Sequence, residues 1–258
     1  APDEVSGKIV TGEADIAAAP INLAAALYNK TEGKVAIIAV NTLGVLYVLE
    51  NGETVNSIAD LSGKTLYATG QGATPEFVLN YLLEKNGVDG KVDVQYMADH
   101  AELAALLAAD EGGVKIAMLP EPNVTAALLK NSSLRIALDL TEEWNKVSGG
   151  AQLVQGCLIA RKDVLENNPD AVNAFLEEYA AATAFVNEKP DDAAALIEKY
   201  GIMASAAAAK TAIPNCNIVC VTGEDMQADA LAMLQVLFAA DPKSVGGKLP
   251  GDDFYYLP

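Results

Sequence analysis

Short apolar runs alternate along this chain with longer segments in which apolar residues recur every three or four positions. Short runs bounded by turn residues are typical of buried strands, and the longer pattern is typical of amphipathic helices. We therefore predict strands over residues 15–19, 35–40, 44–50, 65–68, 92–97, 115–119, 134–138 and 153–160. We predict helices over residues 22–29, 57–61, 75–86, 101–109, 122–130, 169–188, 190–199 and 222–239.

The order of these elements indicates the fold class. Strands and helices alternate up to the strand 153–160, and long helices dominate after it. Alternation of this kind is typical of an α/β protein with a mainly parallel sheet and helices on its faces. A length of 258 residues allows one large domain or two smaller lobes. We predict no regular element over 141–150, and we expect the C-terminal GDDFYYLP to pack on a surface.

The most informative segment is residues 63–83, GKTLYATGQGATPEFVLNYLL. The strand 65–68 runs into a glycine turn, 70–73, after which Thr74 and Pro75 suit the N-cap and first turn of a helix. Such a junction can direct several backbone N–H groups at one spot, where a carboxylate, phosphate, sulfonate or polar ligand edge can bind. The alternative is that the two glycines only form a tight turn. The segment matches neither a P-loop nor a dinucleotide motif.

Charge and composition narrow the possible partners. The chain has 17 Lys and Arg against 35 Asp and Glu, which gives a net charge of −18. Binding to phosphate-rich surfaces requires concentrated Lys and Arg, so we expect neither nucleic acid nor anionic membrane as a partner. The uncharged apolar stretch 35–49 is shorter than the about 18 residues that a membrane span needs. Of three cysteines, Cys216 and Cys220 are close enough in sequence to bridge or share a metal, but we expect buried free thiols.

Residues for catalysis are sparse. His100 is the single histidine, and its position after Asp99 predicts a surface residue in the first turn of a helix that Asp99 caps. The sequence has no Gly-x-Ser-x-Gly elbow, no His-Glu-x-x-His and no cysteine pair at zinc spacing. We therefore expect binding rather than catalysis, with no catalytic residues, no metal and no cofactor.

Strand-to-helix junctions are the other informative places. Ligands of open α/β sheets bind outside the carboxyl ends of strands, where loops lead into helix N-termini. Side chains suited to a polar ligand occur at junctions 19–22, 40–43, 70–74 and 119–123. Each junction also has a structural explanation. Asn22 and Asn123 can satisfy backbone groups at helix starts, and Glu121 can form a turn between two prolines.

Long stretches of the chain resemble a known family. They are GEADIAAAPINLAAALYNK, IADLSGKTLYATGQGATPEFVLNYLLEKNGV, MLPEPNVTAALL and ARKDVLENNPDAVNAFLEEYAAATAFVNEKPDDAAALIEKYG. Together they resemble the solute-binding proteins of ABC importers, and most closely the group related to nitrate, sulfonate and thiamine-precursor binders. The resemblance covers nearly the whole chain. It is specific for the family and unspecific for the ligand.

The resemblance implies a type II periplasmic-binding-protein-like fold with two α/β lobes and a ligand cleft between them. Lobe 1 would hold residues 1–50 and 151–258, and lobe 2 residues 51–150. The strands 44–50 and 153–160 would lie at the crossings between lobes. Family members usually begin with a further βα unit, so we expect the first βα unit to be missing from this sequence. The implied ligand contacts are Asn22, Asn41, Thr42, Gln71, Gly72, Ala73, Thr74, Glu121 and Asn123.

The resemblance also implies partners and a location. The protein would be a monomer that delivers a small molecule to ABC permease subunits. It would be extracytoplasmic, either periplasmic or lipid-anchored to the outer face of the cell membrane. Anions, sulfonates, pyrimidines and related heterocycles remain open as ligands, because Lys and Arg are sparse near the four junctions.

Two rival functions share the fold. A thiamine-pyrimidine-synthase-like enzyme would need a histidine-centred site and a Cys-rich iron-binding stretch, and neither occurs in this sequence. The effector domain of a transcription regulator would normally follow a basic DNA-binding helix pair, which this acidic chain does not show. A binding assay with a parallel test for turnover distinguishes these possibilities.

Overall fold

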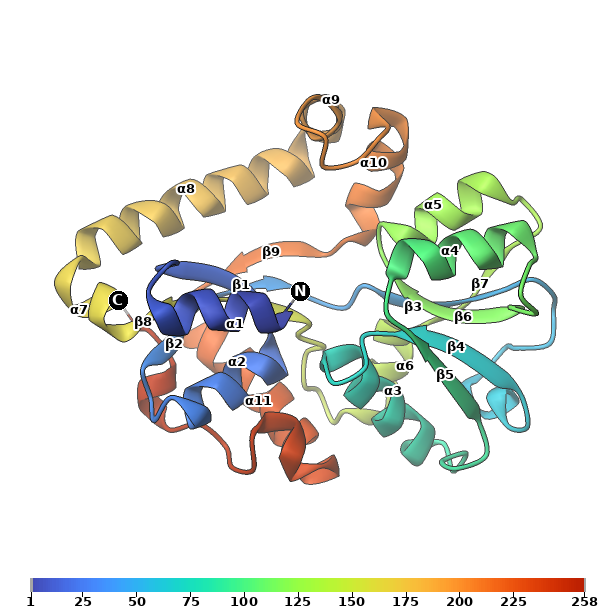
Figure 1. The fold of residues 1–258 in the computed structure, drawn as a ribbon, viewed down its shortest axis with the longest axis horizontal. Helices are drawn as coiled ribbons and strands as arrows, with labels where there is room; N and C mark the ends of the chain where they lie inside the picture. The colour runs from blue at the N-terminus through green and yellow to red at the C-terminus, as the bar shows by residue number, and fades with distance from the viewer. Residues whose placement is uncertain (1, 258) are drawn as a thin grey trace. The chain divides into compact units, whose positions relative to one another are not determined.

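The computed structural model describes residues 2–257 of the chain, which form two compact units (Figure 1). Unit 1 contains the residues up to Leu43, Gly150–Phe185 and the residues from Ile218 onward. Unit 2 contains Gly44–Gly149 and Val186–Asn217. Among the described residues, none of the helices is long and apolar enough to cross a lipid bilayer.

This division differs from the predicted lobes at two places. Residues 44–50 were predicted in lobe 1, but in the structure they provide an inner strand of the unit 2 sheet. Residues 186–217 were also predicted in lobe 1, and they belong to unit 2 because α10 (Ala206–Ala212) packs against α5 (Asn123–Lys130). The second difference depends on a contact between segments far apart in sequence, which a local pattern does not encode.

Unit 2 is built on a mixed five-stranded sheet in the order β5-β4-β6-β3-β7. Its strands are β3 (Leu46–Glu50), β4 (Thr65–Thr69), β5 (Asp93–Met97), β6 (Ile116–Pro120) and β7 (Arg135–Asp139). β4 is parallel to β5 and β6, whereas β3 is antiparallel to β6 and β7. β4, β5, β6 and β7 therefore run in the same direction.

Helices cover both faces of the unit 2 sheet. α4 (His100–Ala109) and α5 lie on one face, and α3 (Thr74–Lys85) and α6 (Leu140–Val147) lie on the other (Figure 1). Alternation along β3 explains the two cores, since Tyr47 and Leu49 pack with Leu103 and Leu107 while Val48 faces the opposite way. The unit is completed by η1 (Ile58–Leu61), α9 (Pro190–Lys199), α10 and η2 (Ile213–Asn215).

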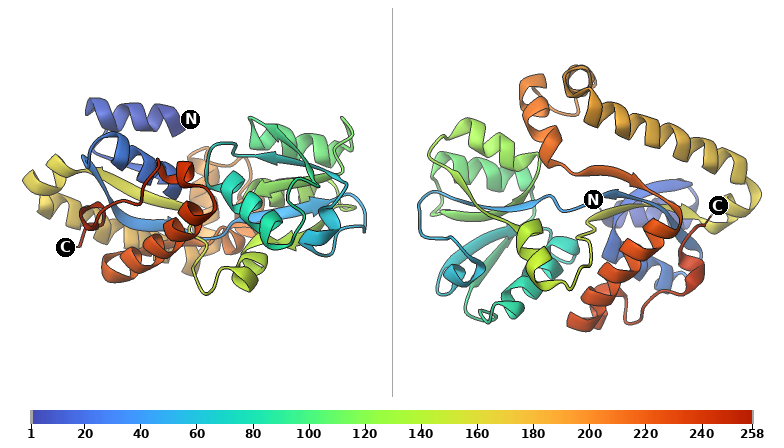
Figure 2. Two further views of the ribbon diagram at one scale, coloured as in Figure 1. Left: turned by 90° about the horizontal axis from the view of Figure 1, so that it is seen from below. Right: turned by 180° about the vertical axis from the view of Figure 1, so that it is seen from behind.

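Unit 1 is built on a four-stranded sheet in the order β1-β8-β2-β9. The strands are β1 (Ile16–Pro20), β2 (Val35–Thr42), β8 (Gly156–Arg161) and β9 (Ile218–Val221), and their described pairings are all antiparallel. α2 (Ile21–Lys30) and α11 (Gly223–Ala240) pack on each other and on β2, as can be followed in Figure 2. α8 (Pro169–Glu188) contributes Val172 and Leu176 to a core with Ile38 and Leu158. The remaining elements are α1 (Pro2–Thr11), α7 (Lys162–Asn167), η3 (Pro242–Val245) and η4 (Asp252–Phe254).

The predicted α/β class with helices flanking the sheets is confirmed, but the mainly parallel pairing is wrong. In unit 1, β8 returns from unit 2 and lies between β1 and β2, so it runs against both. The segment 141–150 was predicted irregular, yet most of it forms α6. The C-terminal sequence also forms an element, since η4 buries Phe254 completely and Tyr255 bridges to Ile37 in β2.

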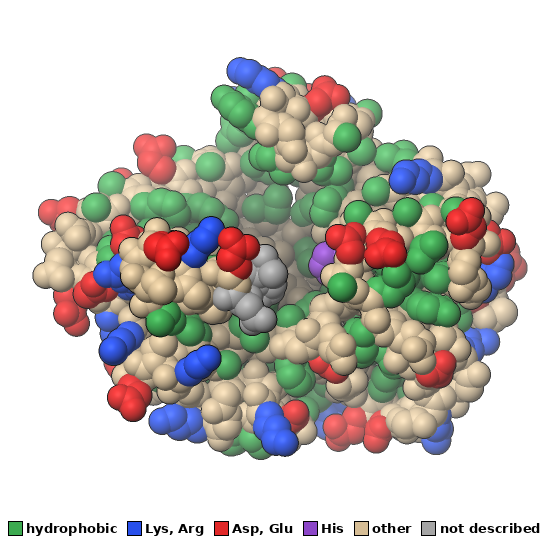
Figure 3. All heavy atoms as spheres, viewed as in Figure 1, with side chains coloured by type: hydrophobic (Ala, Val, Ile, Leu, Met, Phe, Trp, Pro, Cys, Tyr) green, Lys and Arg blue, Asp and Glu red, His purple; other side chains and the backbone are tan. Residues whose placement is uncertain are grey.

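Charged side chains are spread over the visible surface. On the face drawn in Figure 3, acidic and basic side chains are interspersed, and the chain as a whole has 35 Asp and Glu against 17 Lys and Arg. In unit 1, Asp253 accepts hydrogen bonds from Tyr28 and Lys162, and these contacts attach the C-terminal segment to α2 and α7.

Unit 1 also has a groove between α1 and the ends of β2 and β8, where Lys162 and Arg161 lie.

Candidate functional site

The candidate site in unit 2 lies where four strands of one direction end. β4 ends at Thr69, β5 at Met97, β6 at Pro120 and β7 at Asp139, and their register places these ends along one edge of the sheet. We call this the carboxyl edge. α3, α4, α5 and α6 all begin there, one after each strand. This is the place where α/β sheets bind ligands.

The predicted glycine turn follows β4. Gly70 and Gly72 have φ values of 82° and 77°, a left-handed conformation that favours glycine. The turn amides already donate within the chain: Gly72 to Glu76 Oε2 at 2.5 Å and Ala73 to the Gly70 carbonyl at 3.1 Å. Two of the turn's N–H groups are therefore already hydrogen-bonded within the chain. The helix also begins one residue early, with Ala73 rather than Thr74 as the N-cap.

His100 begins α4, directly after β5. Asp99 caps the helix as predicted, since its carboxylate accepts from the Glu102 amide at 2.8 Å. His100 is more than the surface residue that the sequence predicted, because its Nδ1 lies 2.6 Å from the Thr69 hydroxyl at the end of β4. Burial lowers the pKa of His100, although the nearby Asp99 carboxylate acts in the opposite direction. The lowered pKa favours the neutral form of the imidazole.

Glu121 follows β6 and is only 8% exposed. Its carboxylate accepts from the Thr125 amide at 3.0 Å and from the Thr125 hydroxyl at 2.9 Å, which stabilises the first turn of α5. Burial raises the pKa of Glu121, while hydrogen bonds from Thr125 and Asn215 partly oppose it. Asn123 is the first residue of α5 and is partly exposed.

Sequence reasoning missed the residues that surround Glu121. The Tyr47 hydroxyl donates to the Asn215 carbonyl at 3.3 Å, and Asn217 donates to the Gly44 carbonyl, so residues 213–217 lie against the carboxyl edge. Burial, together with the charges of Asp139 and Glu121, raises the pKa of Tyr47 to about 12. The pKa of the Cys216 thiol rises to about 11, again mainly through burial. The only signal for this segment was the short polar PNCN sequence after an alanine-rich stretch.

Gly44 opens unit 2 beside the same edge. A Cβ atom at this position would lie 2.0 Å from the Thr141 hydroxyl oxygen, so glycine is required here for space. Thr141 lies in the first turn of α6, whose N-cap Asp139 accepts from its amide at 2.8 Å. The close approach joins the start of β3 to the start of α6.

Three predicted site residues belong to unit 1. Asn22 is 1% exposed, and its side-chain amide donates to the Ser244 carbonyl at 3.3 Å, so it attaches α2 to η3. Asn41 and Thr42 end β2, with the Thr42 hydroxyl donating to Asn41 Oδ1 at 3.2 Å. Gly156 leaves room for Asn41, because a Cβ there would lie 2.8 Å from Asn41 Oδ1.

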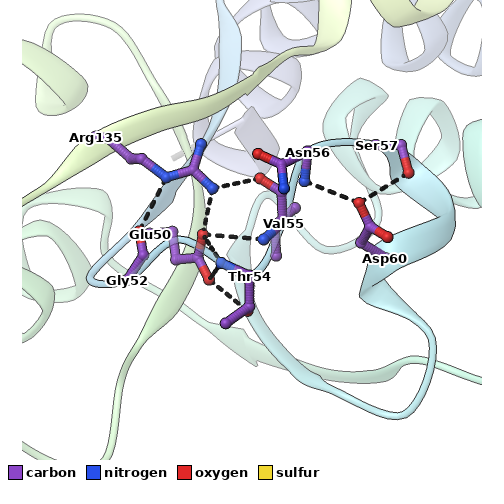
Figure 4. Close-up of polar contacts among 8 residues, drawn as sticks. All are labelled: Glu50, Gly52, Thr54, Val55, Asn56, Ser57, Asp60 and Arg135. Atoms are coloured by element: carbon purple, nitrogen blue, oxygen red, sulfur yellow. Dashed lines mark hydrogen bonds and ion pairs between the residues drawn. The ribbon is translucent and has the colours of Figure 1, made fainter.

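At the opposite ends of the unit 2 strands, Glu50 and Arg135 form an ion pair that is part of a hydrogen-bond network (Figure 4). Glu50 at the end of β3 accepts from Arg135 at 2.6 Å, from the Thr54 hydroxyl at 2.6 Å and from the Val55 amide at 3.1 Å. Arg135 also donates to the Gly52 carbonyl at 2.9 Å. Burial opposes ionisation of Glu50, but these hydrogen bonds outweigh it and lower its pKa. The network fixes loop 51–57.

The structure therefore brings six predicted site residues together at the carboxyl edge and places the other three in unit 1. Those at the carboxyl edge are Gln71, Gly72, Ala73, Thr74, Glu121 and Asn123; Gln71 and Gly72 are exposed, whereas Thr74 is fully buried. Within the part of the chain that the structure describes, no group of three or more His, Cys, Asp or Glu side chains could hold a metal ion. Cys157, Cys216 and Cys220 are free thiols, of which Cys157 is buried.

Solved structures with the same fold include proteins of ABC transporters. A protein from Parabacteroides distasonis described as an ABC transporter is 26% identical, with a TM-score of 0.81 over 99% of this chain and 85% of that chain. The periplasmic aliphatic sulphonate-binding protein SsuA from Escherichia coli is 16% identical, with a TM-score of 0.77 over 100% and 80% of the two chains. The alkanesulfonate-binding protein SsuA from Xanthomonas axonopodis pv. citri, bound to MOPS, is 15% identical, with a TM-score of 0.72 over 93% and 80%. The two SsuA proteins show the fold alone.

Sequence comparison identifies the family. No curated protein sequence matches the chain. The profile described as NMT1/THI5 like matches residues 3–193, which is more than half of the sequence. The resemblance that the sequence motifs predicted is thus confirmed at the level of the family. The protein belongs to the NMT1/THI5-like family.

Proposed function

We propose that this protein is the solute-binding component of an ABC importer, which captures a small polar molecule and delivers it to a membrane permease. The observation that carries the proposal is similarity to proteins of ABC transporters over nearly the whole chain, with polar residues at the ends of the strands. Family membership is consistent with this role. An extracytoplasmic location, periplasmic or lipid-anchored, is part of the proposal, and the structural neighbour SsuA from Escherichia coli, which is described as periplasmic, supports it.

The proposed ligand contacts are residues with exposed or partly exposed atoms. In unit 2 they are Gln71, Gly72, Ala73 and Asn123, and in unit 1 they are Asn41 and Thr42. Asn22, Thr74 and Glu121 are buried, so we assign them the role of holding the ligand-binding loops in position. No chemical step is assigned to any of these residues.

A ligand screen with a turnover control tests the proposal. A ligand at a hundred times its dissociation constant should stabilise the protein by about 2.7 kcal/mol, because it binds the folded state only. The screen should include amino acids, anions, sulfonates, pyrimidines and amines, with thermal unfolding as the readout. Each hit is then incubated with the protein and recovered for mass spectrometry, where we expect it unchanged. Conversion of a hit to product, or no stabilisation by any class, would contradict the proposal.

A further inference from the structure

Two asparagines of this chain, Asn51 and Asn86, are each followed directly by a glycine. Asn-Gly pairs are prone to spontaneous deamidation, because glycine has no side chain to keep its backbone nitrogen away from the asparagine side chain. Exposure to solvent favours reaction at Asn86, which is exposed, over Asn51, which is only partly exposed. The hydrogen bonds around the two pairs favour the opposite order.

Deamidation joins two groups that must be free to meet. The backbone nitrogen of the glycine attacks Cγ of the asparagine, the bond from Cγ to the side-chain nitrogen breaks, and ammonia leaves with the proton of the glycine amide. Water then opens the resulting cyclic imide at one of its two carbonyls, which gives aspartate or isoaspartate. The reaction consumes water, releases ammonia and requires no cofactor.

At Asn86 both reacting groups are held by the end of α3. The Gly87 amide donates to the Glu84 carbonyl at 3.0 Å, and Asn86 Nδ2 donates to the Leu82 carbonyl at 2.8 Å. Bonds of this kind satisfy the last carbonyls of a helix. Deamidation at Asn86 therefore requires that both bonds break first.

At Asn51 the attacking nitrogen is free. Asn51 follows β3, and its own amide donates to the Lys115 carbonyl at 2.8 Å. Arg135 donates to the Gly52 carbonyl at 2.9 Å (Figure 4), but none of the hydrogen bonds between described residues uses the Gly52 amide. The Asn51 side chain lies beside Asp110, an exposed carboxylate at the end of α4.

We propose that Asn51 is a site of spontaneous deamidation in the folded protein, and that Asn86 is protected from it by the hydrogen bonds that end α3. The inference goes beyond the proposed solute-binding function and does not depend on it. Because breaking the two hydrogen bonds at Asn86 costs free energy, reaction there should be at least about tenfold slower than at Asn51.

The product changes the network around Glu50. Isoaspartate adds a methylene to the backbone between the Asn51 amide and the Gly52 carbonyl, which are both hydrogen-bonded to other parts of unit 2. Either product also adds a negative charge next to Gly52, where a Cβ atom would lie 3.3 Å from Glu50 Oε1. Loop 51–57 should therefore be held less firmly, and the deamidated protein should unfold at a lower temperature.

Incubation of the full chain tests the proposal. The protein is kept at mildly alkaline pH, where the attacking amide loses its proton more readily, and samples are digested and analysed by mass spectrometry. In the folded protein we expect aspartate and isoaspartate to accumulate at residue 51 and hardly at residue 86. In concentrated urea the two sites should react at similar rates, because both asparagines precede glycine and neither is held by a folded structure.

Matched variants identify the source of the acidic form, which anion exchange separates by its extra negative charge. Asn51→Gln should prevent this form from accumulating, because glutamine must close a larger ring and reacts more slowly. Asn86→Gln is the matched control and should leave the accumulation unchanged. Thermal unfolding of the separated acidic form should show the lower unfolding temperature.

Three results would count against the proposal. Reaction at Asn86 that equals or exceeds reaction at Asn51 in the folded protein would overturn it. So would the absence of deamidation at Asn51 in the folded protein over the time in which the chain in urea reacts completely. An acidic form that unfolds at the same temperature as the intact protein would contradict the effect on the Glu50 network.

Discussion

Individual side chains in this protein act mainly by satisfying backbone groups of neighbouring loops. Glu50 does so for two amides of loop 51–57 and also pairs with Arg135. The Glu50 carboxylate is almost fully buried, since its side chain is 3% exposed, whereas the Arg135 side chain is 31% exposed. Removing one partner of such a pair leaves buried groups without compensation, so loss of charge at Glu50 is costly.

Glu50→Gln should destabilise the protein by about 2 kcal/mol, because an amide cannot accept all the hydrogen bonds of the carboxylate. The measurement is chemical denaturation at pH 7. Glu53→Gln, at an exposed position of the same loop, is the control and should have almost no effect.

The pH dependence of stability gives a second readout for Glu50→Gln. The folded pKa of Glu50 lies below its ordinary value of 4.5, so its contribution is present above that pH and is lost as pH falls further. The variant should therefore lose less stability than the wild type on acidification below about pH 4.5. Equal losses in the two proteins would contradict this account.

At the scale of elements, the sequence predicted most helices and strands but not how the strands pair. The helix 75–86 and the strand 65–68 are confirmed within a residue or so, because glycine and proline mark their ends. The antiparallel position of β8 was not predictable from alternation, since the chain leaves for unit 2 and returns before that strand forms. β9 has only four residues, all partly exposed, and gives little periodic signal.

The failure to predict α6 has a different cause, because its sequence does contain helix signals. Its sequence has Asp139 followed three residues later by Glu142, a pattern typical of a helix start, and Trp144 provides the buried face. The sequence also predicted only part of the candidate site. The ends of strands located Gln71, Glu121 and their neighbours, but the contact of residues 213–217 with that edge required the three-dimensional fold.

Trp144→Ala should cost about 3–5 kcal/mol, the usual range for removal of a fully buried aromatic side chain. Trp144 packs against the Tyr81 ring, with ring centroids 5.0 Å apart, and so joins α6 to α3. Urea denaturation followed by circular dichroism measures the loss. Asn145→Ala changes the next, exposed residue of the same helix and should leave stability within about 0.5 kcal/mol. A loss below about 1 kcal/mol for Trp144→Ala would show that α6 does not pack as described.

The whole molecule is dominated by its charge. With a net charge of −18, the excess acidic side chains repel one another in the folded state. The described ion pairs on the surface are exposed on one or both sides, so they contribute little stabilisation. Screening by salt reduces this repulsion, while the network around Glu50 is shielded from salt by burial.

The unfolding temperature should therefore rise when sodium chloride is increased from about 10 mM to about 500 mM, where the Debye length is far shorter. Scanning calorimetry at pH 7 gives the measurement. Choline chloride at the same ionic strength should produce the same shift, because screening depends on ionic strength and not on the identity of the cation. A fall in unfolding temperature with both salts would mean that surface ion pairs outweigh the repulsion.

The path of the chain between its two units has a consequence for the order of synthesis. Unit 2 acquires its last residue at Asn217, whereas unit 1 begins at the N-terminus and still requires β9, α11 and Tyr255, which bridges to Ile37. A ribosome therefore completes the residues of unit 2 while β2 in unit 1 still lacks its partner β9. Since domains can fold as soon as their residues emerge, unit 2 can fold completely before unit 1, although synthesis of unit 1 begins first.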